Sequence, residues 1–136
     1  MIQLCLKTTI FLILFAFIAA SYTQTNTNAV DEKTGNLYVL VKYKTQPDKQ
    51  DAALSSLNAL ILEVKKEPHF VNIKMLVDQT DKTNVLLFEE WSDEAYYKGD
   101  HMNTPHLLKF RGEARGFLAG PPEITFWVLN NIYTAD

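Results

Sequence analysis

The chain has 136 residues, of which 47% are apolar and 21% charged, and its formal net charge is −3. A chain of this length forms a single ordinary globular domain, which excludes a multidomain enzyme. Its acidic balance lacks the stripe of positive charge that binding to nucleic acid requires, so no nucleic-acid partner is predicted.

The first 21 residues are typical of a secretory signal peptide. Lys7 precedes 11 apolar residues at positions 10–20, and the small residues Ala20 and Ser21 follow where a signal peptidase could cut. The apolar run is well short of the roughly 20 residues that cross a bilayer, so a retained anchor is the weaker alternative. We therefore predict a periplasmic or secreted protein, without stable membrane association after cleavage.

The mature chain that cleavage leaves has no cysteine, because Cys5 lies in the leader. Disulfides, thiolate nucleophiles and cysteine-bound zinc are therefore excluded from its function. A polar stretch without periodicity at residues 22–35 predicts a disordered spacer. One domain over residues 36–131 and a short tail at 132–136 complete the predicted organisation.

The first half of the domain predicts three strands and one helix. Residues 37–44 indicate a strand, because β-branched and aromatic residues alternate along them. Apolar positions at helical spacing then predict a helix over 48–66, which ends before Pro68. Residues 69–77 and 84–91 predict two further strands that a hairpin loop joins.

The second half predicts two helices and a last strand. Ser92 is expected to cap a short helix. Thr104, with Pro105 after it, begins a second helix that ends before Gly120. Residues 123–129 predict the fourth strand.

This order of elements predicts an α+β fold of the ferredoxin-like, split βαβ type, with a four-stranded antiparallel sheet and helices on one face. The strands at 69–77 and 123–129 are apolar on both faces. Two helices cover one face only, so we expect a second copy of the chain to cover the other. Within the last strand, Phe126 and Trp127 are interpreted as core residues.

Residues that can move protons concentrate between the third strand and the last helix. His101 and His106 are five positions apart with Pro105 between them, which does not suit a metal site on one helix, and no metal is predicted. At the start of a helix, His106 is favoured in its neutral form, which suits contact with a phenol or an enolate. The alternative is that it is simply exposed.

Other side chains in this stretch suit substrate binding. Glu89 and Glu90 point to opposite faces of their strand, so at most one of them enters a pocket. If Trp91 shares a face with Glu89, the two make a small aromatic and acidic site. Arg111 and Arg115, one helical turn apart, could hold an anion together, or they form a solvated basic face.

The segment LLFEEWSDEAYYKGDHMNTPHLLKF resembles the E-x-W, then H-x-x-x-x-H pattern of the antibiotic biosynthesis monooxygenase family, which includes small quinol monooxygenases. The resemblance extends over residues 36–130. It implies ferredoxin-like domains that pair sheet to sheet into a dimeric α+β barrel, each with a pocket between sheet and helices. It also implies oxidation of phenolic or quinol-type aromatics by O₂ without a flavin, metal or other cofactor.

On these grounds we predict an exported, homodimeric, cofactor-independent monooxygenase of a small aromatic substrate. The predicted catalytic residues are His101, His106 and Glu89, and the predicted substrate-binding residues are Trp91, Tyr97, Phe110 and Arg111. Two alternatives use the same scaffold, namely a periplasmic small-molecule binding module and a proton-transfer isomerase. Haem-degrading relatives, which use an Asn, Trp and His constellation, make haem binding a third.

Overall fold

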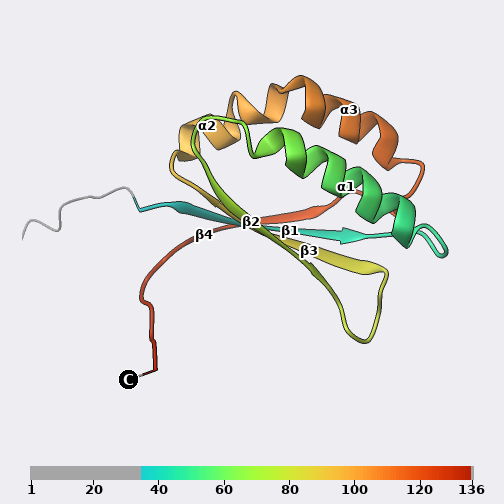
Figure 1. Cartoon of the computed structure of the whole chain (residues 1–136), viewed down its shortest axis with the longest axis horizontal. Coiled ribbons are helices and arrows are strands. Elements are labelled where there is room, and N and C mark those ends of the chain that lie inside the picture. Colours follow the sequence, from blue (N-terminus) through green and yellow to red (C-terminus); the bar gives the residue numbers. More distant parts are fainter. Residues whose placement is uncertain (1–34, 136) are drawn as a thin grey trace, which may run out of the picture. The chain divides into compact units, whose positions relative to one another are not determined.

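A computed structural model describes residues 35–135 of the chain. They form a four-stranded sheet with its helices packed on one face (Figure 1). The elements in chain order are β1 (Leu37–Lys44), α1 (Gln50–Val64), β2 (Phe70–Val77), β3 (Asn84–Trp91), α2 (Glu94–Lys98), a short 3₁₀ helix η1 (His101–Asn103), α3 (Pro105–Ala114) and β4 (Glu123–Val128). The predicted signal peptide, and the predicted spacer up to residue 34, lie outside the described residues.

The sheet has the strand order β2-β3-β1-β4, and every neighbouring pair is antiparallel. This arrangement confirms the predicted ferredoxin-like α+β fold. Because β1 and β3 are the central strands, the alternation that predicted them is regular, and both have the predicted boundaries. The two edge strands, β2 and β4, carry the more irregular patterns of burial.

The core lies between the inner face of the sheet and helices α1 and α3. Alternate residues of β1 and β3 point into it, as their period of two requires. On α1, the buried positions follow helical spacing. The fully or nearly buried apolar residues of these three elements are Leu37, Val39, Val41, Tyr43, Ala53, Leu57, Leu60, Val64, Val85, Leu87 and Trp91.

Both long helices are shorter than the periodicity predicted. Asp48 has a φ of 60°, so the chain cannot be right-handed helix there, and α1 begins only at Gln50. The α3 helix ends at Ala114 because the following residues hydrogen-bond to the end of β1 instead. The Gln46 N–H donates to the carbonyl of Phe117 at 2.8 Å, and the bridge between Thr45 and Leu118 continues this pairing.

The capping residues also differ from the prediction. Asp93, not Ser92, caps α2, because its carboxylate accepts the N–H of Tyr96 at 2.7 Å. The N–H of Ser92 donates to the His69 carbonyl beside β2. Thr104 occupies the predicted position before α3, but its hydroxyl donates to the carbonyl of His101 instead of capping the helix.

The outer face of the sheet carries apolar side chains and has no helix over it (Figure 1). Leu76 and Trp127 are exposed over 51% and 57% of their surface, and Tyr38 packs on Phe88 at 5.8 Å between ring centroids. The interpretation of Phe126 and Trp127 as core is therefore wrong within the described chain. Phe126 does lie on the helical side, but at the sheet edge it is still 46% exposed.

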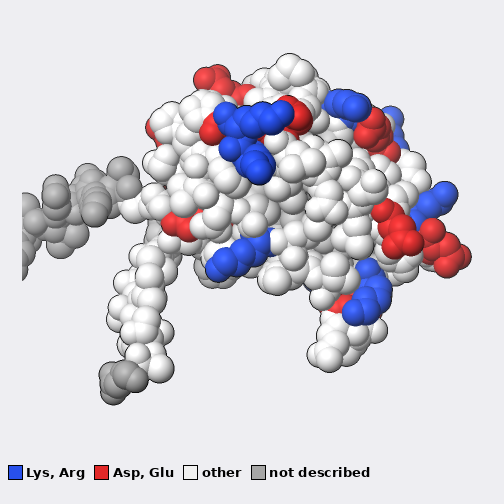
Figure 2. Space-filling model, viewed as in Figure 1, with Lys and Arg blue, Asp and Glu red and all other residues white. Residues whose placement is uncertain are grey.

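The helical layer differs in character from this face. In Figure 2, acidic and basic side chains lie close to one another over the helices, whereas residues 129–135, after β4, include neither kind. Within residues 35–135, no helix is both long and apolar enough to cross a membrane.

Candidate active site

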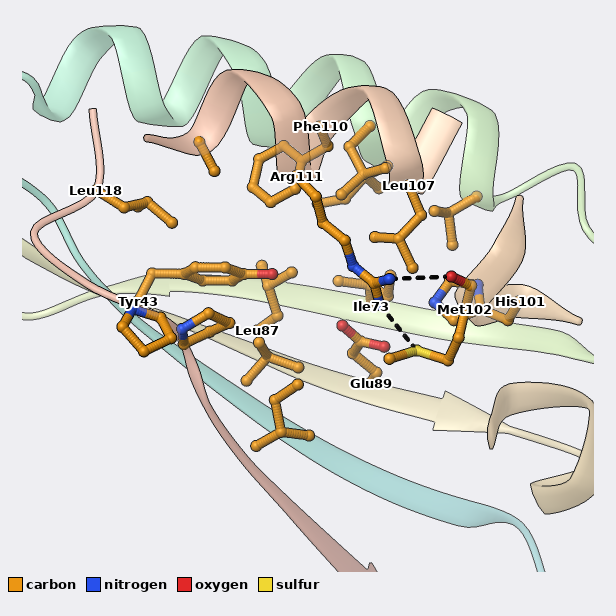
Figure 3. A pocket seen from close by; sticks show the side chains of 18 of the residues that line it. Tyr43, Ile73, Leu87, Glu89, His101, Met102, Leu107, Phe110, Arg111 and Leu118 are labelled. Atoms are coloured by element: carbon orange, nitrogen blue, oxygen red, sulfur yellow. Dashed lines mark hydrogen bonds between the residues drawn. The ribbon is translucent and has the colours of Figure 1, made fainter. Parts of the chain in front are cut away.

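A cavity of about 570 Å³ lies between the inner face of the sheet and helices α1 and α3 (Figure 3). Its walls are mostly apolar, with a few polar groups that converge on it, and its volume suits a small organic ligand. The side chains that matter most for its chemistry are those of Tyr43, Glu89, Tyr97, His101, Met102, Phe110 and Arg111.

Glu89 places a buried carboxyl group in the wall of this cavity. It comes from β3, where alternation points Glu89 inward and Glu90 outward, and only 5% of its surface is exposed. Trp91 Nε1 donates to Glu89 Oε2 at 3.0 Å. Burial raises the pKa of Glu89 to about 7, the hydrogen bond from Trp91 opposes the rise, and the charge of Glu67 adds to it. Glu89 can therefore take up or release a proton near neutral pH.

Glu90 makes only contacts on the outer face. Its carboxylate accepts hydrogen bonds from the side chains of Asn36, Tyr38 and Asn72. The hydrogen bond from Asn36 is the largest of the influences that lower the pKa of Glu90. Glu90 is thus ionised and structural, whereas Glu89 is the carboxyl group that enters the pocket.

His101 places an imidazole in the same cavity. Its ring is 5% exposed and stacks on Tyr97, with ring centroids 4.9 Å apart and an interplanar angle of 23°. Burial lowers the pKa of His101, against the opposing effect of a hydrogen bond to Glu67. That bond joins His101 Nδ1 to Glu67 Oε2 at 2.9 Å. When Nδ1–H donates a hydrogen bond to this carboxylate, Nε2 keeps its lone pair and the neutral ring is a base.

Glu67 is a site residue that the sequence analysis missed. Its side chain is 6% exposed and contacts three others, because Tyr96 donates to Oε2 at 3.0 Å and His106 Nε2 lies 2.5 Å from Oε1. The sequence held an indirect signal. Since antiparallel pairing sets Phe70 opposite Trp91, residues just before β2 must lie beside the end of β3.

Two of the predicted site residues do not line the cavity. His106, on the first turn of α3, contacts Glu67 and faces a shallow hollow between α1 and α3. Trp91 is fully buried behind the wall, where it supports Glu89 and packs on His101 with ring centroids 4.6 Å apart. Both therefore act on the cavity only through other side chains.

The remaining predicted residues, Tyr97, Phe110 and Arg111, do line the cavity, together with Tyr43, which the sequence analysis did not single out. Burial raises the pKa values of Tyr43 and Tyr97, so both phenols stay neutral and can donate a hydrogen bond. Phe110 lines the cavity on the side of α3 and packs edge to face on Tyr43, with ring centroids 5.9 Å apart.

The comparisons with known proteins give the family and the fold of the chain. Over residues 36–113, the chain matches the family model described as antibiotic biosynthesis monooxygenase. No curated protein matches it at a significant level.

Among residues 35–135, no group of three histidine, aspartate or glutamate side chains is arranged to hold a metal ion.

Several solved structures share the fold. A Pseudomonas aeruginosa protein is 21% identical, with a TM-score of 0.67 over 73% of this chain and 98% of its own. A Methanosarcina mazei protein is 20% identical, with a TM-score of 0.64 over 70% and 93%. A Mycobacterium tuberculosis protein is 19% identical, with a TM-score of 0.65 over 74% and 100%. The family match extends over more than half of the sequence, so the chain belongs to the antibiotic biosynthesis monooxygenase family.

Proposed function

We propose that the chain is an exported, homodimeric monooxygenase that oxidises a small hydroxylated aromatic compound with O₂ and needs no cofactor. One observation carries the proposal. Glu89, whose pKa is about 7, and His101, a base whose pKa is lowered by burial, share one mostly apolar cavity. Two proton-transfer groups in a mostly apolar pocket suit the oxidation of an electron-rich phenol or quinol by O₂.

The reaction begins when His101 Nε2 removes the proton of an aromatic hydroxyl group. The resulting phenolate is electron-rich and transfers one electron to O₂, which gives a phenoxyl radical and superoxide. The two radicals combine at a ring carbon that carries hydrogen, so that a C–O bond forms. The proton held on His101 then completes a hydroperoxide at that carbon.

Glu89 completes the reaction as the second base. It removes the hydrogen of the same ring carbon as a proton, the O–O bond breaks, and hydroxide leaves and takes up the proton to become water. One oxygen atom ends in the quinone product and the other in water. The substrate supplies all four electrons that reduce O₂, so the balance needs no external reductant.

Glu67 is a positioning residue in this scheme. By accepting the Nδ1–H of His101, it holds the imidazole in the tautomer that leaves Nε2 free as a base. Tyr96 and His106 hold the Glu67 carboxylate in turn. Trp91 has the same kind of role toward Glu89, whose Oε2 it holds in place through a hydrogen bond.

Oxygen uptake with a panel of hydroquinones and hydroxynaphthalenes tests this function. We expect uptake only with some members of the panel, and a loss of about 100-fold or more in kcat for His101→Ala and for Glu89→Gln. Glu113→Gln, a change in a half-exposed carboxyl group on α3, is the matched control and should retain the wild-type rate. Uptake that survives in both site variants contradicts the proposal. So does a tightly bound ligand that is recovered unchanged in air, as a binding module would give, or solvent deuterium incorporation without uptake, as an isomerase would give.

The proposed homodimer forms through the outer face of the sheet. That face presents Leu76 and Trp127, and the tail beyond β4 adds the exposed side chains of Leu129, Ile132 and Tyr133. An exposed apolar surface of this kind marks a protein interface. Export rests on the leader sequence, and N-terminal sequencing of the mature protein tests it.

Trp127→Glu is expected to dissociate the dimer. A tryptophan buried in an apolar interface commonly contributes about 2 kcal/mol or more, so the dimer dissociation constant should rise by about 30-fold or more. Leu62→Glu is the matched control, because Leu62 is exposed to the same 57% but lies on the helical layer. Light scattering with size-exclusion chromatography gives the masses. A wild-type monomer, or equal loss of dimer in the two variants, contradicts this interface.

A further inference from the structure

Two arginines of α3 and of the turn after it give the cavity a cationic wall. Arg111 and Arg115 both line the cavity, one helical turn apart. In Figure 3 the Arg111 side chain descends from the helix into the cavity, on the side opposite Tyr43. Its guanidinium group donates to the carbonyl of Met102 at 3.1 Å and lies 3.5 Å from Met102 Sδ. Both of these partners are neutral.

No carboxylate neutralises this wall within residues 35–135. The ion pairs of this part of the chain involve other cations, and neither Arg111 nor Arg115 takes part in one. Glu89 lines the same cavity without approaching either guanidinium group to within 4.0 Å. A cation and an acid that line one cavity without pairing are both available to contact a ligand.

The positive charge of Arg111 influences His101 and the phenol group of Tyr43. It lowers the pKa of His101, although less than burial does, and it partly opposes the rise in the pKa of Tyr43 that burial causes. Arg111 is thus directed at the interior of the cavity as well as at solvent. Lys109, two positions earlier, faces the shallow hollow between α1 and α3, so the cationic wall is confined to one side of the helix.

We propose that the substrate is a hydroxylated aromatic acid, whose carboxylate is held by Arg111 and Arg115 while its hydroxyl group lies at His101 and Glu89. This rests on the proposed function, and it names the substrate class for that site. A planar guanidinium group pairs with a carboxylate through two parallel hydrogen bonds, which fixes orientation as well as charge. The apolar walls between the two ends then contact the aromatic ring.

Binding of two matched probes in the absence of O₂ tests the proposal. The probes are 6-hydroxy-2-naphthoate and its neutral isostere 6-hydroxy-2-naphthamide, measured by calorimetry on the intact dimer at pH 7.5. We expect the acid to bind about 10-fold more tightly than the amide, because a charge-assisted pair that solvent partly reaches is worth about that factor. Raising the salt concentration should weaken binding of the acid alone.

Variants assign the preference to the two arginines. Arg111→Gln and Arg115→Gln should each weaken binding of the acid several-fold, and together they should abolish the preference, while binding of the amide shows that the cavity is intact. Lys109→Gln, a cation change on the other side of α3, is the matched control and should alter neither probe. Equal affinity of the two probes for the wild type, absence of binding by the acid, or a preference that survives in the double variant would overturn the proposal.

The same measurement separates this inference from the proposed function. Binding without O₂ needs no turnover, so a preference for the acid that depends on the arginines stands even if no compound of the panel is oxidised. In that case the oxidation fails and the anion site remains. Conversely, oxygen uptake with neutral quinols, together with equal binding of the two probes, supports the oxidation and removes the anion site.

Discussion

Replacing Glu67 by leucine is expected to lower the free energy of unfolding by about 3 kcal/mol, because the change leaves three polar side chains without their acceptor. His101 Nδ1, the Tyr96 hydroxyl group and His106 Nε2 all contact this one carboxylate, which is 6% exposed. His101 should account for the largest part of this loss of stability, since it is buried and cannot form a hydrogen bond with water instead. Urea unfolding of the wild type and the variant measures the difference.

Two further variants isolate the cause. Glu67→Gln keeps the shape and one acceptor oxygen, so it should recover part of the lost stability. It removes the charge, however, and should lower the pKa of His101 further, which imidazole NMR resonances can report. Glu63→Gln changes a half-exposed carboxylate one turn earlier and should change the free energy of unfolding only slightly, because its ion pair with Lys66 is exposed. Equal stability of Glu67→Leu and Glu63→Gln contradicts the role given to Glu67.

Substitution of Glu89 by glutamine is expected to change how stability depends on pH. The pKa of Glu89 is raised from 4.5 to about 7 on folding, so the folded protein binds this proton more tightly than the unfolded chain does. The resulting stabilisation is fully present below pH 4.5 and is lost as the pH rises through 7. A shift of this size corresponds to about 3 kcal/mol.

The measurement is the difference between wild type and Glu89→Gln in urea unfolding, taken at intervals from pH 4.5 to 8. Taking the difference cancels the opposite contribution of carboxylates whose pKa values are lowered, such as Asp81 and Glu90. Glutamine carries no charge at any pH, so the free energy of unfolding of the variant should rise relative to that of the wild type as the pH rises. A difference that stays constant over this range would show that Glu89 has an ordinary pKa and would remove it as a base near neutral pH.

The fold could be predicted from the sequence because its strongest patterns lie in the central strands. Strands β1 and β3 bury one face along eight residues each, so alternation alone placed their ends correctly. Helix ends were harder to predict, since pairing of distant segments determines them. The end of α3 at Ala114 depends on hydrogen bonds between the next residues and the end of β1, which no local pattern contains.

The site could be predicted only in part, for a related reason. Alternation placed Glu89 and Glu90 on opposite faces, so that at most one of them could enter a pocket. Proximity in sequence grouped Glu89 with His101 and Tyr97, and the structure places these three around one cavity. Glu67 lies 34 residues before His101, and only the register of β2 on β3 brings them together. The sequence left open whether Trp91 shares the face of Glu89. It does, but the depth at which the indole is buried depends on its packing against α2 and could not be read from the strand.

The proposed chemistry gives each of a few side chains a separate role. In the proposed scheme His101 and Glu89 move protons, Glu67 and Trp91 hold them in place, and the walls are mostly apolar. The cationic wall formed by Arg111 and Arg115 is proposed to orient an acidic substrate in the same cavity. In this scheme the substrate alone reduces O₂, and the protein supplies bases, orientation and an apolar site.

Turnover under ¹⁸O₂ tests this claim most directly. The protein is freed of metals and flavins by dialysis against chelator and by refolding, and it is then given a substrate from the hydroquinone panel. Mass spectrometry should find one labelled oxygen atom in the quinone product and the other in water, with one O₂ consumed for each product and no hydrogen peroxide released. Product without label, hydrogen peroxide in equal amount to product, or turnover only after a metal or flavin is restored would contradict the account.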